Sequence, residues 1–410
     1  MQALYLSGYG SATDKSDVWH VGPLPKPTLT KPHDVLIRVV AASLNPIDFK
    51  LARGDLRLLG SLSFPLKVGF DVSGVVEAVG ADVREFRAGD AVISRVSHEQ
   101  MGSCAEFVLA SDDNLAKKPH NLSHVEAACL PLAGQTALQA LRLLGCEKRP
   151  APRSVFIPAA LGGVGSLGLQ LAHHHFHVEQ IHTAVSTAKL PLTRHLFPFA
   201  QTVDYKKQEP AQALNGQIDM VFDTTGEAAA YAPMLKRVDE AAAAAAAAAA
   251  PSAKSSLVSI ATSPSPSAAV HLNGERPIPW LVRQVLKFKE WRLRSAAAKQ
   301  NALYEFYVLS SNAADLNLLV QLAEAGHLQP LVGKVFSLQA GRAAFAAAEN
   351  SSAITGKVVI QVAKDGDEEP PQDAQGTVPN RTRALDAEAK ADAAPAAAAA
   401  AGSSAPAPVA

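Results

Sequence analysis

Ser154-Val-Phe-Ile-Pro-Ala-Ala-Leu-Gly-Gly-Val-Gly-Ser-Leu-Gly168 is the stretch of this 410-residue sequence that decides its fold. The apolar residues 155–157 are typical of a short strand buried on both faces. Val164, Leu167 and Leu171 follow at helical spacing. The stretch therefore predicts a strand, a tight glycine turn and a helix, in that order.

The glycines of this turn, Gly163, Gly165 and Gly168, form the pattern G-x-G-x-x-G. Backbone N–H groups at a helix start, with the positive end of the helix dipole, bind anions such as a pyrophosphate, and side chains would block that approach. The pattern alone is a weak signal, because any tight strand-to-helix turn can use glycine. Its place between strand and helix is what the dinucleotide-binding fingerprint requires. We expect the cofactor at Gly162, Gly163, Val164 and Gly165; a turn without ligand is the alternative.

Length and charge bound the possible functions. A chain of 410 residues is too long for one small core and predicts two domains. The 38 basic and 38 acidic residues give a formal net charge of zero. We therefore expect a small-molecule partner and no attraction to nucleic acid or to an anionic membrane. Three scattered cysteines predict buried free thiols in a reducing compartment.

The sequence carries no recognisable sorting signal. Residues 1–8 lack a basic stretch followed by an apolar core, and they are not rich in arginine and serine. No apolar run approaches the length that spans a bilayer. We expect a cytoplasmic protein, with a plastid location left open.

Strand and helix patterns divide the chain into two parts. Short strands expected at 35–40, 72–79 and 90–94, separated by glycine and proline, predict a partly open antiparallel barrel. A capped helix start at Ser123 and a helix over 132–144 lead into the glycine turn. Strands then alternate with helices, which predicts a parallel α/β sheet with strands near 180–184, 202–205, 218–223 and 256–260.

Several segments of this sequence resemble the zinc-independent quinone oxidoreductases of the medium-chain dehydrogenase/reductase superfamily. They include Asn45-Pro-Ile-Asp-Phe-Lys50, Gly69-Phe-Asp-Val-Ser-Gly74, Gly162-Gly-Val-Gly165 and Gly356-Lys-Val-Val-Ile360. Within that group, the Asn-Pro-x-Asp-x-Lys pattern and residues 183–189 are most similar to plant enone and alkenal reductases. The resemblance runs from residue 1 to about residue 362.

The resemblance implies a two-domain architecture and a homodimer. A GroES-like substrate domain of β-barrel type would span 1–125 and be completed by 326–363, around a Rossmann domain over 126–325. The alanine-rich run 241–253 reads as a surface insertion, and the proline-, alanine- and acid-rich tail 364–410 as disordered. A further departure from the family is the segment 196–201.

The expected chemistry uses no metal. Gly69-Phe-Asp71 stands where zinc-dependent relatives carry Gly-His-Glu. NADPH would deliver hydride to the β-carbon of a conjugated carbonyl, while hydrogen-bond donors stabilise the enolate oxygen. His173 and His177, one helical turn apart in sequence, raise a metal site as an alternative. No carboxylate motif accompanies them, and histidines at a helix end complement its dipole.

Asn45, Asp48 and Lys50 are the residues expected beside the reacting atoms, because the resemblance implies that their loop faces the nicotinamide. Lys50 would donate to the cofactor or to the developing oxyanion, and Asp48 would orient Lys50. A surface lysine without a role is the alternative for Lys50.

The remaining cofactor contacts are expected at Thr136, Tyr205 and Ile260, by resemblance to the family. The alternatives are a helix-start threonine and a strand-end aromatic. Residues 183–189 contain no acid that would bind the ribose of NAD. Ser186, Thr187 and Lys189 instead supply donors and a cation for the 2′-phosphate of NADPH, with an ordinary helix cap as the alternative.

Together these patterns predict an NADPH-dependent oxidoreductase that reduces quinones or the C=C bond of α,β-unsaturated carbonyls. A non-catalytic NADPH-binding protein with a structural or regulatory role is the alternative.

Overall fold

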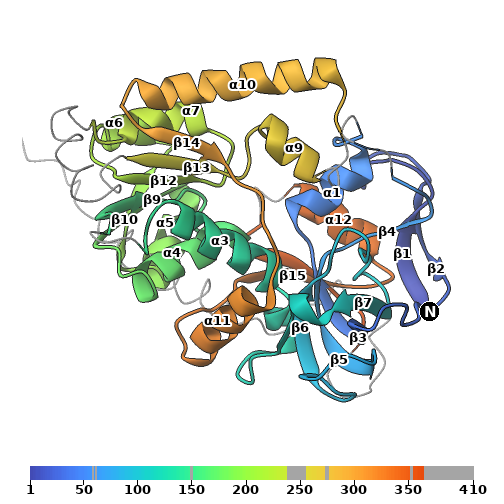
Figure 1. Cartoon of the computed structure of the whole chain (residues 1–410). Helices are drawn as coiled ribbons and strands as arrows, with labels where there is room; N and C mark the ends of the chain where they lie inside the picture. Colours follow the sequence, from blue (N-terminus) through green and yellow to red (C-terminus); the bar gives the residue numbers. More distant parts are fainter. Residues whose placement is uncertain are drawn as a thin grey trace, which may run out of the picture.

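The computed structural model describes residues 1–57, 60, 62–147, 151–237, 255–272, 277–350 and 354–363. The alanine-rich run 241–253 and the tail 364–410 lie outside these residues, so what was predicted for them is not assessed. Figure 1 shows an α/β half that contains the central part of the chain and a β-rich half that contains the N-terminal part.

The α/β half is built on a parallel sheet of six strands in the order β11-β10-β9-β12-β13-β14. Numbered within this sheet, the order is 3-2-1-4-5-6, that of a doubly wound Rossmann fold. The predicted parallel sheet is therefore confirmed. In sheet order the strands are β11 Ala200–Asp204, β10 Gln180–Val185, β9 Ser154–Phe156, β12 Met220–Asp223, β13 Ser256–Ser259 and β14 Leu303–Phe306.

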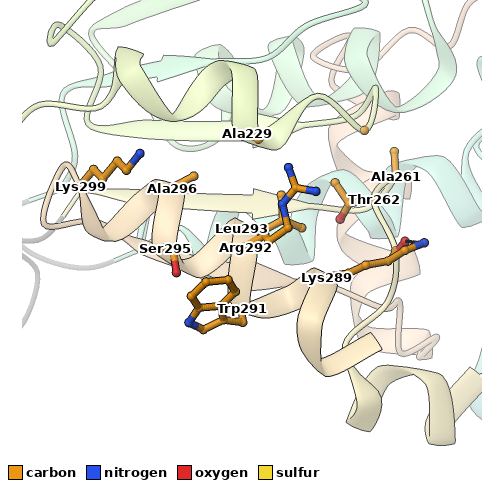
Figure 2. Close-up of a pocket in the computed structure, with 12 residues that line it drawn as sticks. Ala229, Ala261, Thr262, Lys289, Trp291, Arg292, Leu293, Ser295, Ala296 and Lys299 are labelled. Carbon is orange, nitrogen blue, oxygen red and sulfur yellow. Dashed lines mark hydrogen bonds between the residues drawn. The ribbon is translucent and has the colours of Figure 1, made fainter. Parts of the chain in front are cut away.

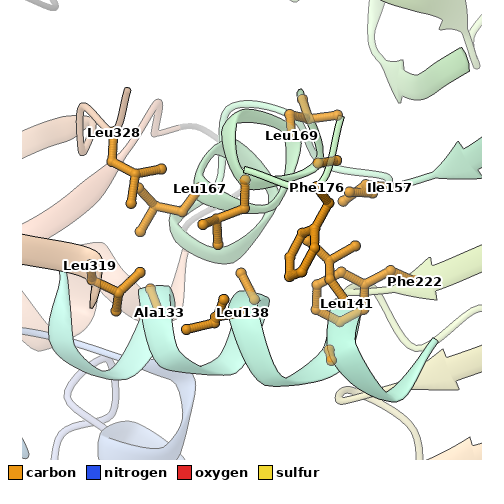
Figure 3. Close-up of a cluster of buried hydrophobic side chains, with 14 of the residues drawn as sticks. Ala133, Leu138, Leu141, Ile157, Leu167, Leu169, Phe176, Phe222, Leu319 and Leu328 are labelled. Atoms are coloured by element: carbon orange, nitrogen blue, oxygen red, sulfur yellow. The ribbon is translucent and has the colours of Figure 1, made fainter. Parts of the chain in front are cut away.

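Helices pack on this sheet through a continuous apolar core. Figure 3 shows Leu138 and Leu141 of α3 meeting Leu167 of the glycine helix, Phe176 just beyond its end and Phe222 of the sheet. The helices of this half are α3 Pro131–Leu143, α4 Gly163–His174, α5 Leu190–Leu196, α6 Pro210–Ala213, α7 Ala228–Tyr231, α9 Pro266–Leu272, α10 Trp280–Ala298 and α11 Ala313–Glu324.

The β-rich half contains a seven-stranded sheet in the order β15-β16-β3-β5-β6-β8, with β7 also paired to β3. Its pairs are antiparallel except β15 with β16, which run parallel. The C-terminal strands β15 and β16 thus join the sheet of the N-terminal strands. The strands are β3 Asp34–Ser43, β5 Asp71–Val79, β6 Ala91–Arg95, β7 Phe107–Ser111, β8 Leu115–Lys117, β15 Val332–Ser337 and β16 Lys357–Gln361.

In the part of the chain that the structure describes, this half also contains a second, three-stranded sheet and three helices. The sheet has the order β2-β1-β4, and its strands are β1 Gln2–Leu6, β2 Trp19–Pro23 and β4 Leu66–Lys67. The helices are α1 Pro46–Arg53, α2 His124–Ala127 and α12 Gly341–Glu349. Helix α2 begins at the predicted cap, where the Ser123 N–H donates to the Glu126 carboxylate at 3.0 Å.

The long helix α10 was not predicted. Its sequence interleaves large apolar and basic residues, so no single apolar stripe marks an inner face. In Figure 1 it runs along the outside of the α/β half, beyond β14.

Truncating Leu138 should test the packing of α3 on the sheet. Leu138 is fully buried, whereas Leu143 on the same helix is 37% exposed. We expect Leu138→Ala to lower the free energy of unfolding by about 2–5 kcal/mol, because it leaves a cavity. Leu143→Ala should change it by less than about 1 kcal/mol. Denaturant unfolding of the two variants measures both, and equal losses would contradict this account of the core.

Candidate functional site

The glycine turn has the geometry of an anion site. Gly162 caps α4 with φ −86° and ψ 167°, and the helix begins at Gly163. A Cβ at Gly165 would lie 2.2 Å from the carbonyl oxygen of Ala159. No side chain fits there, and the N–H groups of a first helical turn have no partner within their helix. The turn therefore suits the pyrophosphate of a dinucleotide.

A second cluster forms where β10 and β11 end side by side. Val185 pairs in register with Asp204, and the Tyr205 N–H donates to the Val185 carbonyl at 3.1 Å. Ser186 caps a short 3-10 turn over Thr187–Lys189. Burial lowers the pKa of Lys189. The structure thus brings together Ser186, Thr187, Lys189 and Tyr205, which the sequence analysis names separately.

Asp204 adds an acid to this cluster. The Thr187 hydroxyl donates to its carboxylate at 2.7 Å. No acid lies within residues 183–189, whereas Asp204 arrives from the neighbouring strand. Strand register, which the sequence does not show, places it there.

Ile260 and Thr136 occupy different surroundings. Ile260 directly follows β13, and its N–H donates to the Asp223 carbonyl at 3.1 Å, so it lies at the same carboxyl edge of the sheet. Thr136 lies in the second turn of α3, which begins at Pro131, and is 6% exposed. It is not a helix-start threonine, and its cofactor contact stays a prediction.

Asn45 and Asp48 are almost fully buried at the start of α1, with 3% and 1% exposure. The Asn45 N–H donates to the Asp48 carboxylate at 2.7 Å. The Asn45 side-chain amide donates to Asp71 at 2.8 Å and accepts from the Lys357 ammonium at 2.5 Å. Asn45 is therefore held by charged groups on both sides.

Asp71 connects four parts of the chain. Its carboxylate accepts hydrogen bonds from the Ser43 hydroxyl at 2.9 Å and from the Leu132 N–H, in the first turn of α3, at 2.8 Å. The Lys357 ammonium lies 3.4 Å away, and the exposures of the Asp71 and Lys357 side chains are 0% and 6%. Buried ions persist only when each is paired and hydrogen-bonded. Asp71 and Lys357 were not predicted as site residues, although both lie in segments that resemble the family.

Asp48 has an unusual electrostatic environment. Burial raises its pKa to about 7; the hydrogen bond from the Asn45 backbone opposes this shift, Asp71 adds to it, and Lys357 and Arg95 oppose it. Its Oδ1 atom has no hydrogen-bond partner among the described residues. The expected pairing of Asp48 with Lys50 is thus replaced by contacts with Asn45 and by the charges of Lys357 and Arg95.

Lys50 lies half-buried on α1, two residues beyond Asp48 and five beyond Asn45. Burial lowers its pKa, an effect that Asp55 opposes. It is thus a partly desolvated cation on α1.

Lys357 joins the glycine turn to the Asn45 loop. Its ammonium holds Asn45 and Asp71, while a Cβ at Gly163 would lie 3.0 Å from its Cγ. Gly163 was predicted to bind the cofactor, and Asn45 was predicted to lie beside the reacting atoms. Lys357 contacts both residues.

Comparisons with known proteins agree with this architecture. Residues 31–120 match the alcohol dehydrogenase GroES-like domain, and residues 197–360 match the zinc-binding dehydrogenase domain. The quinone oxidoreductase of Coxiella burnetii superimposes with a TM-score of 0.69 at 25% identity, over 88% of this chain and 99% of that one. The chain belongs to the medium-chain dehydrogenase/reductase superfamily. The predicted fold class, a Rossmann sheet with a GroES-like β domain, is confirmed.

Two curated members of the superfamily are similar over half of their length. The 2-methylene-furan-3-one reductase of Solanum lycopersicum is 38% identical over 203 residues, which are 48% of this chain and 51% of that protein. The chloroplastic NADPH-dependent alkenal/one oxidoreductase of Arabidopsis thaliana is 39% identical over 202 residues, with the same shares. The matched region thus spans about half the length of these relatives.

A hollow beside α10 lies next to Ile260, because its lining includes Ala261 and Thr262. Figure 2 shows it between the turn before α7, the loop after β13 and α10. Its lining includes Thr262, Lys289 and Arg292, and the Lys289 ammonium donates to the Ser263 hydroxyl at 3.2 Å. Its lining in the described structure contains none of the predicted site residues.

The histidines near the end of α4 do not form the helical pair that the alternative, a metal site, would need. Helix α4 ends at His174, and His177 has φ +55°, so His173 and His177 are not one turn apart on one helix. The His173 ring instead stacks on the Phe199 ring, with their centroids 4.0 Å apart. Phe199 belongs to the segment 196–201, which departs from the family. Among the described residues, no three His, Cys, Asp or Glu side chains gather as metal ligands.

None of the helices described is both long and apolar enough to cross a bilayer.

Asp48→Asn should change how stability depends on pH. The carboxyl has a pKa of about 7 in the folded protein against a model value of 3.8, so the folded state binds a proton that the unfolded state releases between these values. Raising the pH from 4 to 7 should therefore destabilise the parent relative to Asp48→Asn. The difference reaches at most about 4 kcal/mol, since one pKa unit is worth about 1.4 kcal/mol.

Denaturant unfolding of both proteins at several pH values measures this difference. The asparagine oxygen can still accept the bond from the Asn45 N–H, so the cap is kept in the variant. Parallel pH profiles for the two proteins would contradict a raised pKa at Asp48.

Proposed function

We propose that this chain is an NADPH-dependent reductase of quinones or of the C=C bond of α,β-unsaturated carbonyls. The observation that carries the proposal is the Lys357 side chain, which lies against Gly163 while its ammonium holds Asn45 and Asp71. A dinucleotide on the glycine turn would then extend toward the Asn45 loop. The names of the relatives, an enone-type reductase, an alkenal/one oxidoreductase and a quinone oxidoreductase, support this substrate class.

The cofactor is assigned to the carboxyl edge of the Rossmann sheet. The first turn of α4 would bind the pyrophosphate through Gly163, Val164 and Gly165. Lys189 would supply the cation for the 2′-phosphate, with Ser186 as a donor beside it. Thr187 is held by Asp204, so its part is to position the turn rather than to donate a free hydroxyl. The carboxylate of Asp204 lies beside this site and would repel the 2′-phosphate, so it opposes the attraction by Lys189.

NADPH would supply the hydride, and the chain would supply position and charge. Lys50, half-buried and partly desolvated, is proposed to donate to the cofactor or to the enolate oxygen. Asn45 is a positioning residue, because both ends of its amide are bound to charged groups. The Asp71 carboxylate is occupied by Ser43, Leu132 and Lys357, which makes it a poor metal ligand and favours zinc-free transfer.

The proposed enzyme is a homodimer of a reducing compartment, the cytosol or a plastid. β14 is the last strand of its sheet, and Leu303 on it is 58% exposed. An open strand edge is a surface for pairing with another chain. Cys104, Cys129 and Cys146 are free and buried, as a reducing compartment allows. Light scattering tests the dimer, and cell fractionation tests the location.

NADPH oxidation with a panel of enones, alkenals and quinones tests the proposed reaction. We expect turnover with at least one class. Lys50→Ala should lower kcat/KM about tenfold or more, because it removes the cation near the reacting carbonyl or the cofactor. Lys31→Ala removes an exposed cation elsewhere and should leave kcat/KM unchanged. NADPH binding without turnover of any substrate would favour the non-catalytic alternative, and unchanged kinetics in folded Lys50→Ala would remove Lys50 from the site.

Cofactor choice tests the phosphate pocket. We expect a preference for NADPH over NADH of about tenfold or more, since Lys189 is the cation at the end of β10. Lys189→Ala should raise the KM for NADPH and leave the KM for NADH unchanged. Lys207→Ala, an exposed lysine beyond the neighbouring strand, is the matched control. A variant that weakens both cofactors alike would show that Lys189 does not bind the 2′-phosphate.

A further inference from the structure

Helix α10 exposes an unusual amount of apolar surface. Nine large apolar side chains are exposed in the described structure, and five of them lie on this helix. Their exposed fractions run from 50% to 71%, for Trp280, Leu281, Val285, Phe288 and Trp291. Contiguous apolar surface of this kind marks an interaction site, whereas single exposed residues do not.

These side chains share one face of α10. At 100° per residue they fall on the side opposite Leu286 and Ala297, which are buried at 8% and 0% exposure. The Phe288 and Trp291 rings stack, with their centroids 5.8 Å apart. Figure 2 shows Trp291 projecting from the side of α10 away from Ala229. The helix is therefore apolar on two faces, one toward the sheet and one outward.

Basic residues border the outward face. Residues 280–299 contain six lysines and arginines and a single acid. That acid, Glu290, is paired with Arg294 at 2.8 Å. By helical position Arg283, Lys287 and Arg294 border one edge of the apolar face, and Lys289 and Arg292 the other. Because the whole chain has a formal charge of zero, this positive charge is local and is balanced elsewhere.

We propose that α10 is an interfacial helix that docks the protein on an anionic lipid surface. Tryptophan and phenylalanine rings favour the boundary between headgroups and acyl chains, and flanking lysines and arginines bind lipid phosphates. Lys289, Arg292 and Lys299 also line the hollow beside the helix (Figure 2). The helix lies on the membrane and does not span it, because its charges border the apolar face along its length. The sequence analysis, using net charge alone, expected no such attraction.

A second copy of this chain fits the face less well. Symmetric dimers bring the same patch of both subunits together. The basic edges of one α10 would then meet those of the other, and like charges at close range repel. An anionic lipid surface complements both the apolar face and its basic edges.

Vesicle binding tests the proposal with the full chain. We expect the protein to cosediment with mixed phosphatidylglycerol–phosphatidylcholine vesicles and not with pure phosphatidylcholine. Salt at about 0.5 M should release it, because the Debye length falls to roughly 4 Å. Tryptophan emission should shift to the blue on binding, since Trp280 and Trp291 are exposed whereas Trp19, the third tryptophan, is 7% exposed.

Paired variants locate the binding face. Phe288→Ser with Trp291→Ser, and separately Lys287→Gln with Arg292→Gln, should each lower the vesicle partition coefficient about tenfold or more. The matched controls are Leu143→Ser and the pair Arg84→Gln with Arg87→Gln, which alter exposed residues elsewhere and should leave partition unchanged.

Three results would overturn the proposal. One is no binding of the parent to anionic vesicles, and another is full binding by both α10 variants. The third comes from light scattering, if the parent is a dimer that Phe288→Ser with Trp291→Ser dissociates while vesicles bind neither protein. That result would assign the face to contact between two copies.

Discussion

The buried carboxylate of Asp71 is the interaction on which the rest of this structure depends. A carboxylate removed from water costs several kcal/mol unless its oxygens are satisfied and its charge is balanced. Here Ser43, Asn45 and the first turn of α3 donate to it, and Lys357 balances it. Ser43 is the last residue of β3, and Asn45 lies at the start of α1. Helix α3 leads into the Rossmann sheet, and Lys357 begins the C-terminal strand β16.

This dependence explains why the chain returns to its N-terminal sheet at its C-terminal end. Asp71 and Lys357 are 286 residues apart in sequence. Strand β16 pairs antiparallel with β3, which sets Lys357 beside the residues that hold Asp71. Without that return, the Asp71 carboxylate, whose exposure is 0%, would be buried without a counter-charge. The same arrangement raises the pKa of Asp48 to about 7, chiefly through burial and further through Asp71.

What the sequence predicted correctly was local chemistry, and what it missed depended on contacts between distant segments. The glycine turn and the Ser123 cap were predicted because their geometry is written in a few adjacent residues. Asp204 entered the cofactor cluster through strand register, and Lys357 reached Asn45 through a strand that closes the sheet. Helix α10 was missed because it is apolar on two faces, which removes the single stripe by which a helix is recognised.

The packing of the glycine turn limits which of its residues can be substituted during evolution. A side chain at Gly165 would collide with the Ala159 carbonyl at 2.2 Å, and one at Gly163 would crowd the Lys357 stem at 3.0 Å. Both constraints come from the protein itself and act whether or not a dinucleotide is bound. A descendant that lost its cofactor would still be selected to keep Gly165, because the Ala159 backbone leaves no space for a side chain there, so the persistence of this glycine reports on folding. Loss of ligand binding would be recorded instead at residues whose side chains serve the proposed ligand, such as Lys189.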